Sequence, residues 1–582
     1  MIRKPTLLTL TSTLLALAAA GSAGCELEAN STLPARMPQA AATPPSDMEA
    51  NTVPQPVPVL DPLGTKPALP PAKPYEPSAP SVFKAGNGMT IWLLERHTLP
   101  LVSATVTVAS GSAADPKDRA GLAFITADML DEGAGKRNAV ELSSAINDLG
   151  ASLATGARMD GSYASITVLK KNWKPAFDIL SDVVARPRFE PKEWKRVSDL
   201  WKNDLQKRVQ EPNAVARVVS AAVLYGPGTP YGHPTDGLVE DAKKIDLGAV
   251  RAFYDASFRP DQATLVVVGD INKDEVIEAV NASLGAWKSP KPAPKGAPAP
   301  APAPAITVRA DAPRLVIVDR PDAPQSVVAV VREGVTASDP KAPMLDLINS
   351  ALGGSFSSRL NQNLREDHSW TYGAGSRFTE SRNVGAFSAR ASIVTEATGP
   401  ALKEMLGELE KMATSGLSDE ELSKVKAQDR AELVQTYERV DGVAQRLGTL
   451  AILGLSPSFD ASSSRARQQA SKAQLAALAS AVASPKSSII VVGPKSAVLP
   501  QLKAIGLPDP EIWDAEGFPL KATDVPAKPG ATPASPAPGS KPGVTPASPA
   551  PGSKPGATPA SPAPGSKPGA TPATPAPAAP KK

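Results

Sequence analysis

An internal duplication constrains this chain more than any other feature of its sequence. Two blocks, residues 81–287 and 306–515, carry the same succession of signals: a proline before an apolar strand, a glycine, an Asp-Pro pair, a long charged helix and a closing apolar strand. The closing strands read LVVVG at 265–269 and IIVVG at 489–493. Strand and helix periodicities within each block predict an α+β domain that occurs twice.

The predicted elements of the two blocks correspond. In the first block, alternation predicts strands over 90–94 and 104–108, and a charged helix is expected to begin near Pro191. Its counterpart in the second block is expected to begin near Ser418. Ser418 and Glu421 have the spacing of a capping box, in which each side chain bonds the other residue's backbone N–H.

Proline-rich stretches flank and separate the blocks. Of 582 residues, 63 are proline and only 4% are aromatic, so much of the chain cannot form packed core. Residues 26–80 are predicted to be a disordered tether, 288–305 a semi-rigid Pro/Ala linker and 516–582 a disordered tail. The tail carries a 13-residue repeat without an apolar face, first at 528–540, which excludes a solenoid.

The basic character of the chain comes from this tail. The formal net charge is +4, but the residues after Asp524 include six lysines and no acid, which leaves −2 for the rest. No cluster of lysine or arginine with interleaved aromatics occurs elsewhere. A nucleic acid is therefore not expected as a partner.

The N-terminus has the pattern of an export signal. Arg3 and Lys4 precede an apolar run over 7–20, and Ser-Ala-Gly stands before Cys25, the only cysteine. Residues 22–25 resemble a bacterial lipobox, so residues 1–25 are expected to be a lipoprotein signal and Cys25 the acylated residue. Since Glu26 follows, the expected location is the outer membrane, facing the periplasm. The alternative is an ordinary cleaved signal that happens to contain a cysteine.

Several short motifs occur in the order known from one peptidase family. They are NGMTIWLL at 87–94, Pro100, Gly111-Ser112, GLA at 121–123, YGHP at 231–234 and VGD at 268–270. With the duplication, they resemble the insulinase/pitrilysin metallopeptidases, especially the processing-peptidase subgroup with two homologous domains per chain. The resemblance implies two α/β sandwich domains that form a clam-like chamber.

The zinc motif of that family is degenerate here. Active members carry His-x-x-Glu-His on a helix after Gly-Leu-Ala, where the two imidazoles hold one Zn²⁺ and the Glu activates its water. This chain has Phe124, Ala127 and Asp128 at those positions. Because phenylalanine has no donor atom and alanine cannot act as a base, we expect no metal or other cofactor in this chain, and zinc only in a partner subunit.

The family's third ligand, a glutamate, falls near Asp204. Asp128 and Asp204 are enough to attract a hard cation, but two carboxylates without a third ligand are more often solvated or paired with lysines. In the second block the corresponding positions are Ile348, Ala351 and Leu352, which predict a core face.

The chain's three histidines form no zinc constellation, because more than a hundred residues separate each from the next. We expect His97 and His368 to be exposed. His233 belongs to the YGHP turn, where a structural role is favoured.

The second block retains a different functional element. The segment from Gly353 to Tyr372 resembles the family segment that ends in an Arg-x6-Tyr pair, and Arg365 and Tyr372 match that pair. An arginine can hold a peptide carbonyl, and a tyrosine hydroxyl can donate to a developing oxyanion. The alternative is that Arg365 caps or salt-bridges a helix and Tyr372 begins a buried strand.

Three functions compete. In the first, this chain is a non-catalytic complementary subunit that supplies Arg365 and Tyr372 to a separate, zinc-bearing homologous peptidase acting on peptides. In the second, it is a peptide-binding or scaffold lipoprotein without a proteolytic role. The third, a zinc peptidase active alone, conflicts with Phe124 and Ala127.

Overall fold

The computed structural model describes residues 75–289, 309, 311–484 and 486–521, which belong to one compact unit. The predictions for the signal segment, Cys25, almost all of the tether and linker, and the repeats of the tail lie outside these residues. Within them, no helix is both long and apolar enough to cross a membrane.

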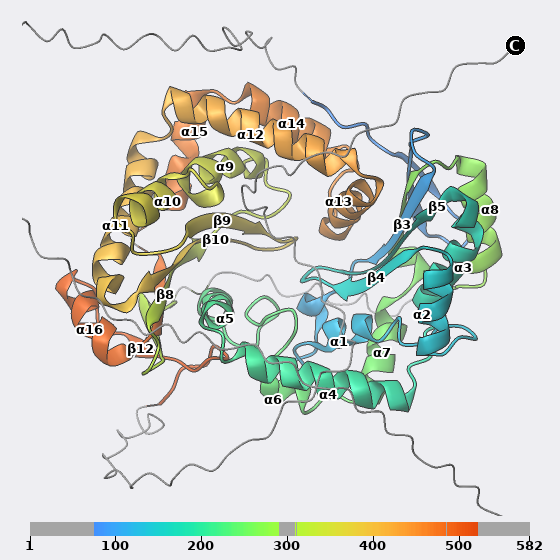
Figure 1. Cartoon of the computed structure of the whole chain (residues 1–582), viewed down its shortest axis with the longest axis horizontal. Helices are drawn as coiled ribbons and strands as arrows, with labels where there is room; N and C mark the ends of the chain where they lie inside the picture. Colours follow the sequence, from blue (N-terminus) through green and yellow to red (C-terminus); the bar gives the residue numbers. More distant parts are fainter. Residues whose placement is uncertain (1–74, 290–308, 310, 485, 522–582) are drawn as a thin grey trace, which may run out of the picture. The chain divides into compact units, whose positions relative to one another are not determined.

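The first block forms a six-stranded sheet with the order β1-β2-β6-β3-β5-β4 (Figure 1). Strands β2 and β6 are parallel, and the other neighbours are antiparallel. The strands are β1 Ser81–Lys84, β2 Thr90–Glu95, β3 Leu101–Val108, β4 Ser152–Ala157, β5 Ser162–Leu169 and β6 Ala263–Gly269.

The second block repeats this topology in the order β12-β7-β11-β8-β10-β9. Its strands are β7 Leu315–Asp319, β8 Gln325–Glu333, β9 Ala374–Glu380, β10 Gly385–Val394, β11 Ser488–Gly493 and β12 Glu511–Ile512. Five strands correspond one to one, including the parallel pair β7 and β11. The outermost strand differs, because β1 precedes its antiparallel neighbour β2 whereas β12 comes from the end of the block and pairs parallel to β7. The predicted duplicated α+β fold is confirmed.

Helices cover both sheets. Those of the first block are α1 Leu122–Asp128, α2 Ala139–Asp148, α3 Trp173–Ala185, α4 Pro191–Arg208, α5 Pro212–Tyr225, α6 Val239–Ala242, α7 Leu247–Ser257 and α8 Lys273–Leu284. Those of the second are α9 Ala342–Asn349, α10 Arg359–Asn361, α11 Thr398–Ser415, α12 Asp419–Glu438, α13 Val440–Leu453, α14 Phe459–Gln469, α15 Lys472–Leu478 and α16 Lys495–Ala504. The expected starts at Pro191 and after Ser418 are confirmed, and the capping box of Ser418 and Glu421 is formed.

The two blocks exchange one helix each. Helix α5 of the first block packs on the second sheet, where Val215 and Val219 lie in one core with Val327 and Ile490. Helix α13 of the second block packs on the first sheet, and Figure 1 shows it beside β3. Each sheet is thus buried on one face by its own helices and on the other by a helix from the other block.

The contact of α13 is close because its apolar face and a glycine meet the sheet. Val443, Leu447 and Leu450 are fully buried against Val266 and its neighbours. A Cβ atom on Gly448 would lie 3.3 Å from the methyl groups of Thr105 and Thr107. Burying one leucine contributes about 1.5–3 kcal/mol, so this exchanged helix adds substantially to stability.

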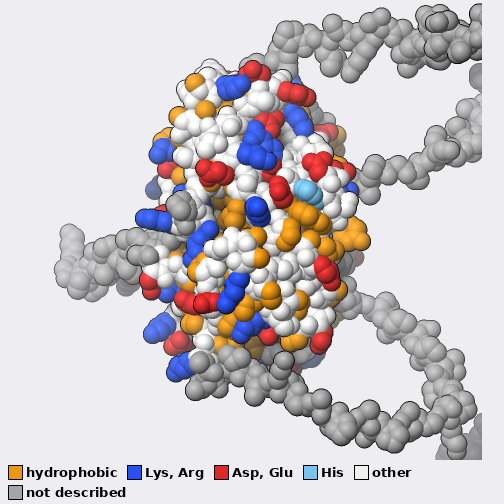
Figure 2. All heavy atoms as spheres, turned by 90° about the vertical axis from the view of Figure 1, so that its left-hand side faces the viewer, with side chains coloured by type: hydrophobic (Ala, Val, Ile, Leu, Met, Phe, Trp, Pro, Cys, Tyr) orange, Lys and Arg blue, Asp and Glu red, His pale blue; other side chains and the backbone are white. Residues whose placement is uncertain are grey.

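The outer surface carries charges of both signs. Figure 2 shows one face of the molecule, on which basic and acidic side chains are interspersed with apolar ones. On that face, the described residues form no continuous basic patch.

Candidate functional site

The helix that carries the degenerate zinc motif begins at a fixed turn. Gly121 has φ +97°, and a Cβ atom there would lie 2.7 Å from the Trp201 ring, so only glycine fits. The carboxylate of Asp115 accepts hydrogen bonds from the N–H groups of Gly121 and Ala123, both at 2.7 Å. Asp115 thereby satisfies two of the donors that are unpaired at a helix start, and it fixes where α1 begins.

The three motif positions on α1 have different surroundings. Phe124 is half-buried and lines a cavity of about 530 Å³. Ala127 is fully buried, whereas Asp128 is exposed. Partial desolvation by the surrounding protein, reinforced by the charge of Glu132, raises the pKa of Asp128 to about 6.

Asp204 lies on the exposed side of α4. Its carboxylate accepts a hydrogen bond from the Lys207 ammonium group at 2.9 Å, and its side chain is 70% exposed. Its charge contributes to the raised pKa of Asp128, so the two carboxylates are neighbours. Among the residues that the structure describes, no group of three or more His, Cys, Asp or Glu side chains is arranged to hold a metal ion.

The side chains at the family's zinc position do not fit a zinc ion. Zinc in catalytic sites takes three nitrogen, sulfur or oxygen ligands from the protein and keeps one position for water. Phe124 supplies no donor, and Ala127 supplies no base for a bound water. Asp128 and Asp204 leave the donor set incomplete.

The cavity beside Phe124 is lined by both blocks. Its walls come from 157–160 and 235–236 of the first block and from 379–381, 449 and 452–453 of the second. Glu380 is the carboxylate of the second block in this wall, and its Oε1 atom is buried without a hydrogen-bond partner in the described structure. Burial, reinforced by the charge of Asp346, raises the pKa of Glu380 to about 8. No motif in the sequence pointed to Glu380.

The corresponding positions of the second block form core, as predicted. Ile348 and Leu352 are fully buried and Ala351 is 6% exposed. They belong to the apolar cluster between the second sheet and its own helices.

Arg365 and Tyr372 lie on a surface of the second block. Arg365, in the π-helical turn Gln362–Asp367, stacks on the Phe356 ring at 4.5 Å and has a guanidinium nitrogen 3.4 Å from the Glu366 carboxylate. Tyr372 is 90% exposed, and β9 begins two residues later at Ala374. The alternative in which Tyr372 begins a buried strand is therefore wrong. Within the described part of the chain, no hydrogen bond joins the two side chains.

The histidines lie where the sequence placed them. His97 is 57% exposed and contacts Asp270 at 2.7 Å, and exposed His368 stacks on Trp370 with ring centroids 4.1 Å apart. His233 is buried, its Nδ1 atom lies 3.0 Å from the Pro234 carbonyl oxygen, and burial lowers its pKa.

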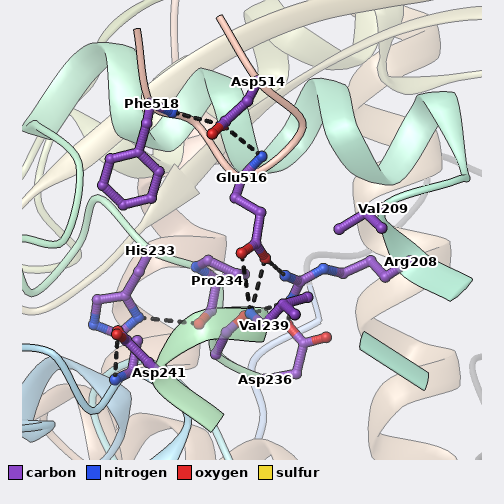
Figure 3. Close-up of polar contacts among 12 residues, drawn as sticks. Arg208, Val209, His233, Pro234, Asp236, Val239, Asp241, Asp514, Glu516 and Phe518 are labelled. Carbon is purple, nitrogen blue, oxygen red and sulfur yellow. Dashed lines mark hydrogen bonds and ion pairs between the residues drawn. The ribbon is translucent and has the colours of Figure 1, made fainter. Parts of the chain in front are cut away.

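The end of the second block forms hydrogen bonds and an ion pair with the first block near His233 (Figure 3). The carboxylate of Glu516 accepts hydrogen bonds from the Val239 N–H at 2.9 and 3.1 Å and from the Arg208 guanidinium at 3.2 Å. Arg208 also pairs with Asp236 at 2.8 Å. Contacts therefore continue beyond residue 515, where the sequence suggested that the second domain ends. A Glu in a loop gave no signal for such a partner.

Comparisons with known proteins agree with this fold. The description "Insulinase (Peptidase family M16)" matches residues 91–227, and "Peptidase M16 inactive domain" matches residues 244–428. A crystal structure of a peptidase M16 inactive domain from Pseudomonas fluorescens is similar with a TM-score of 0.64 and 23% identity, over 71% of this chain and 98% of that one.

Two sequence relatives extend the comparison. An uncharacterized zinc protease of Streptomyces coelicolor is 25% identical, over 55% of this chain and 69% of that protein. The mitochondrial-processing peptidase subunit beta of Dictyostelium discoideum is 24% identical, over 60% of this chain and 74% of that protein. With its duplicated fold and its motifs in family order, the chain belongs to the insulinase/pitrilysin peptidases, family M16.

Proposed function

We propose that this chain is a non-catalytic member of family M16 that acts as the complementary subunit of a zinc-bearing homologue on peptides. The observation that carries the proposal is that α1 is formed as in the family but lacks the zinc-binding and base side chains. The helix, its Asp115 cap and the cavity beside it are present, but the side chains at the ligand and base positions are Phe124 and Ala127. A chain of this kind binds no zinc of its own and activates no water.

Arg365 and Tyr372 are the residues that this proposal assigns to the peptide. The Tyr372 hydroxyl is open to solvent, which leaves it free to donate to an oxyanion at the partner's zinc site. The Arg365 side chain is 36% exposed and can turn from the Phe356 ring towards a peptide carbonyl.

The proposed location is the bacterial envelope. In this proposal, acylated Cys25 holds the chain at the outer membrane, facing the periplasm, and the partner subunit works beside it. More than one acyl chain is needed for firm anchoring, and the lipoprotein pathway attaches several.

The test is reconstitution with a homologue that carries an intact His-x-x-Glu-His motif. Peptide hydrolysis is measured for the homologue alone, for the mixture, and for mixtures with Tyr372→Phe or Arg365→Ala. Loss of an oxyanion donor costs on the order of 100-fold in turnover, so Tyr372→Phe should reduce the rate by about that factor while the melting temperature stays constant.

Tyr254→Phe is the matched control. Its hydroxyl donates to the Val184 carbonyl oxygen at 2.8 Å inside the first block, so the substitution lowers stability by roughly 1 kcal/mol and leaves turnover unchanged. Full activity of the homologue without this chain, or equal rates for wild type and both site variants, would contradict the complementary-subunit role.

A peptide-binding or scaffold lipoprotein is the second candidate. The contacts of Arg365 favour this candidate. Its guanidinium group stacks on Phe356 and lies beside the Glu366 carboxylate, and both residues belong to its own segment rather than to a bound peptide. In that case both site variants leave the rate of any mixture unchanged.

A further inference from the structure

Three arginines line one cavity between the exchanged helix α5 and the second sheet. Arg217 comes from α5, Arg377 from β9 and Arg390 from β10, and all three contribute to the wall of a cavity of about 280 Å³. A second cavity, of about 310 Å³, is also lined by Arg377 and Arg390. No motif in the sequence pointed to this grouping, because the arginines belong to different blocks.

The register of the sheet explains why the side chains meet. Arg377 on β9 is paired with Ser388 on β10, and Arg390 is paired with Gly375, so the two arginines are diagonal neighbours on one face of the sheet. Helix α5 packs over that face. Arg217 lies one turn after Asn213 on α5, and the Asn213 amide contacts the Ser392 hydroxyl of β10 at 3.1 Å.

These arginines lack anionic partners. Within the part of the chain that the structure describes, none of the three guanidinium groups makes a hydrogen bond or an ion pair, and no Asp or Glu lines either cavity. Asp236 is the acid whose charge reaches Arg217, but it is paired with Arg208 at 2.8 Å. The arrangement contrasts with Arg208, Arg359 and Arg446, each of which has a carboxylate within 3.2 Å.

The three guanidinium groups repel one another, and water at the exposed Arg217 and Arg377 screens part of this repulsion. Burial, together with the charges of Arg217 and Arg377, lowers the pKa of Arg390 to about 10. Burial and the charge of Arg377 lower the pKa of Arg217 as well. An anion in the cavity would reverse the repulsion among the three guanidinium groups and accept hydrogen bonds from them.

One part of the cavity wall is apolar and the rest carries hydroxyl groups, and the apolar part indicates which kind of anion fits. Leu224, Val331 and Val384 line it beside the arginines. The volume of this cavity is near the lower limit of about 300 Å³ for ligand sites. It therefore suits the terminal residue of a bound peptide better than a long peptide segment. In a peptide's last residue, a carboxylate and a side chain leave the same Cα atom, so the two reach the arginines and the apolar wall together.

We propose that this cavity binds the C-terminal carboxylate of a peptide whose last side chain is apolar. The inference rests on the proposed peptide-binding function and names the part of the peptide that this chain recognises. Arg377 and Arg390 bind the carboxylate, Arg217 adds charge from the opposite wall, and the apolar side chain packs against Leu224 and Val384.

The test is direct binding to the whole chain in the absence of any partner. Acetyl-Ala-Ala-Leu is titrated as the free acid and as the amide by calorimetry, beside acetyl-Ala-Ala-Asn as free acid and inorganic phosphate. A hydrogen bond to a charged group contributes enough to change affinity about tenfold or more. We expect the leucine acid to bind at least about tenfold more tightly than its amide and than the other two probes.

Variants assign the binding to the cavity. Arg390→Gln and Arg377→Gln should each weaken binding of the leucine acid about tenfold or more without loss of thermal stability, because neither arginine has a partner to lose. Arg439→Gln is the control, since Arg439 is 74% exposed and pairs with Asp441. It should leave binding unchanged.

The outcomes separate this inference from the proposed function. Equal binding of acid and amide, equal binding of phosphate, no binding at millimolar concentration, or wild-type affinity in both cavity variants would each overturn it. The complementary-subunit role is judged separately, by whether the mixture with the zinc-bearing homologue depends on Tyr372.

Discussion

Glu380 offers a quantitative test of the electrostatics in the cavity beside Phe124. Its Oε1 atom is buried and has no hydrogen-bond partner in the described structure, and burial raises its pKa from 4.5 to about 8. Arg446 and Arg467 act in the opposite direction but do not compensate. Replacing Glu380 by Gln removes the ionisable group and keeps the shape, so the variant should gain stability relative to the wild type as the pH rises above 4.5, where the unfolded chain releases the Glu380 proton.

The direction in which the unfolding free energy changes with pH follows from the protons that Glu380 binds in the folded and unfolded chain. Below pH 4.5 Glu380 is protonated in both the folded and the unfolded chain, and it makes no pH-dependent contribution. Between pH 4.5 and about 8 the unfolded chain releases its proton first, so the wild type loses stability as the pH rises. The full shift corresponds to an upper limit of about 5 kcal/mol. Because the side chain borders an open cavity, we expect a stabilisation by Glu380→Gln of about 2 kcal/mol at pH 8.5 and less than about 1 kcal/mol at pH 5.

Urea unfolding of wild type and variant at the two pH values measures this difference. Glu410→Gln, at an exposed position of α11, is the control and should change the unfolding free energy equally at both. A stabilisation by Glu380→Gln that is the same at pH 5 and pH 8.5, or a destabilisation at pH 8.5, would refute the assignment of a strained carboxylate.

Three further predictions concern the metal, the anchor and the exchanged helix. The purified chain should contain less than about one-tenth of an equivalent of zinc and cleave no peptide alone, and elemental analysis with a chelator-sensitive assay checks both; stoichiometric zinc would show that the site has been misplaced. Radiolabelled palmitate should enter the wild type but not Cys25→Ala, and labelling that survives the substitution would exclude this anchor. Leu447→Ala should lower the unfolding free energy by roughly 2–5 kcal/mol, since Leu447 is fully buried between α13 and the first sheet; a change below about 0.5 kcal/mol would mean that this contact is not formed.

The local elements were predictable because their signals are local. The capping box at Ser418 depends on residues three apart, and the closing strands are short apolar runs whose two faces are both buried. A continuous run such as IIVVG already implies cover on both sides of the sheet. The sequence could not reveal that the helix on one face of the second sheet is α5 of the first block. The spacing of apolar residues in α5 is compatible with packing on either sheet.

In the candidate site, too, some residues could be recognised from the sequence and others only from the fold. Phe124 and Ala127 could be read from the sequence, because they follow Gly-Leu-Ala at a fixed spacing on one helix. Arg217, Arg377 and Arg390 could not, since two strands and a helix from different blocks bring them together. Glu380 was equally hidden, because its raised pKa depends first on burial and then on the charge of Asp346, and both arise only in the folded chain.

The exchange of helices also explains how the fold persists without its metal ligands. The two sheets are held together by apolar contacts of α5 and α13 that include none of the motif positions. Phe124 packs at the border of the first core and lines the cavity, so it adds apolar contact at the position where active members carry a histidine. Stability and zinc chemistry therefore depend on different residues, and the residues of zinc chemistry can be replaced while the fold is kept.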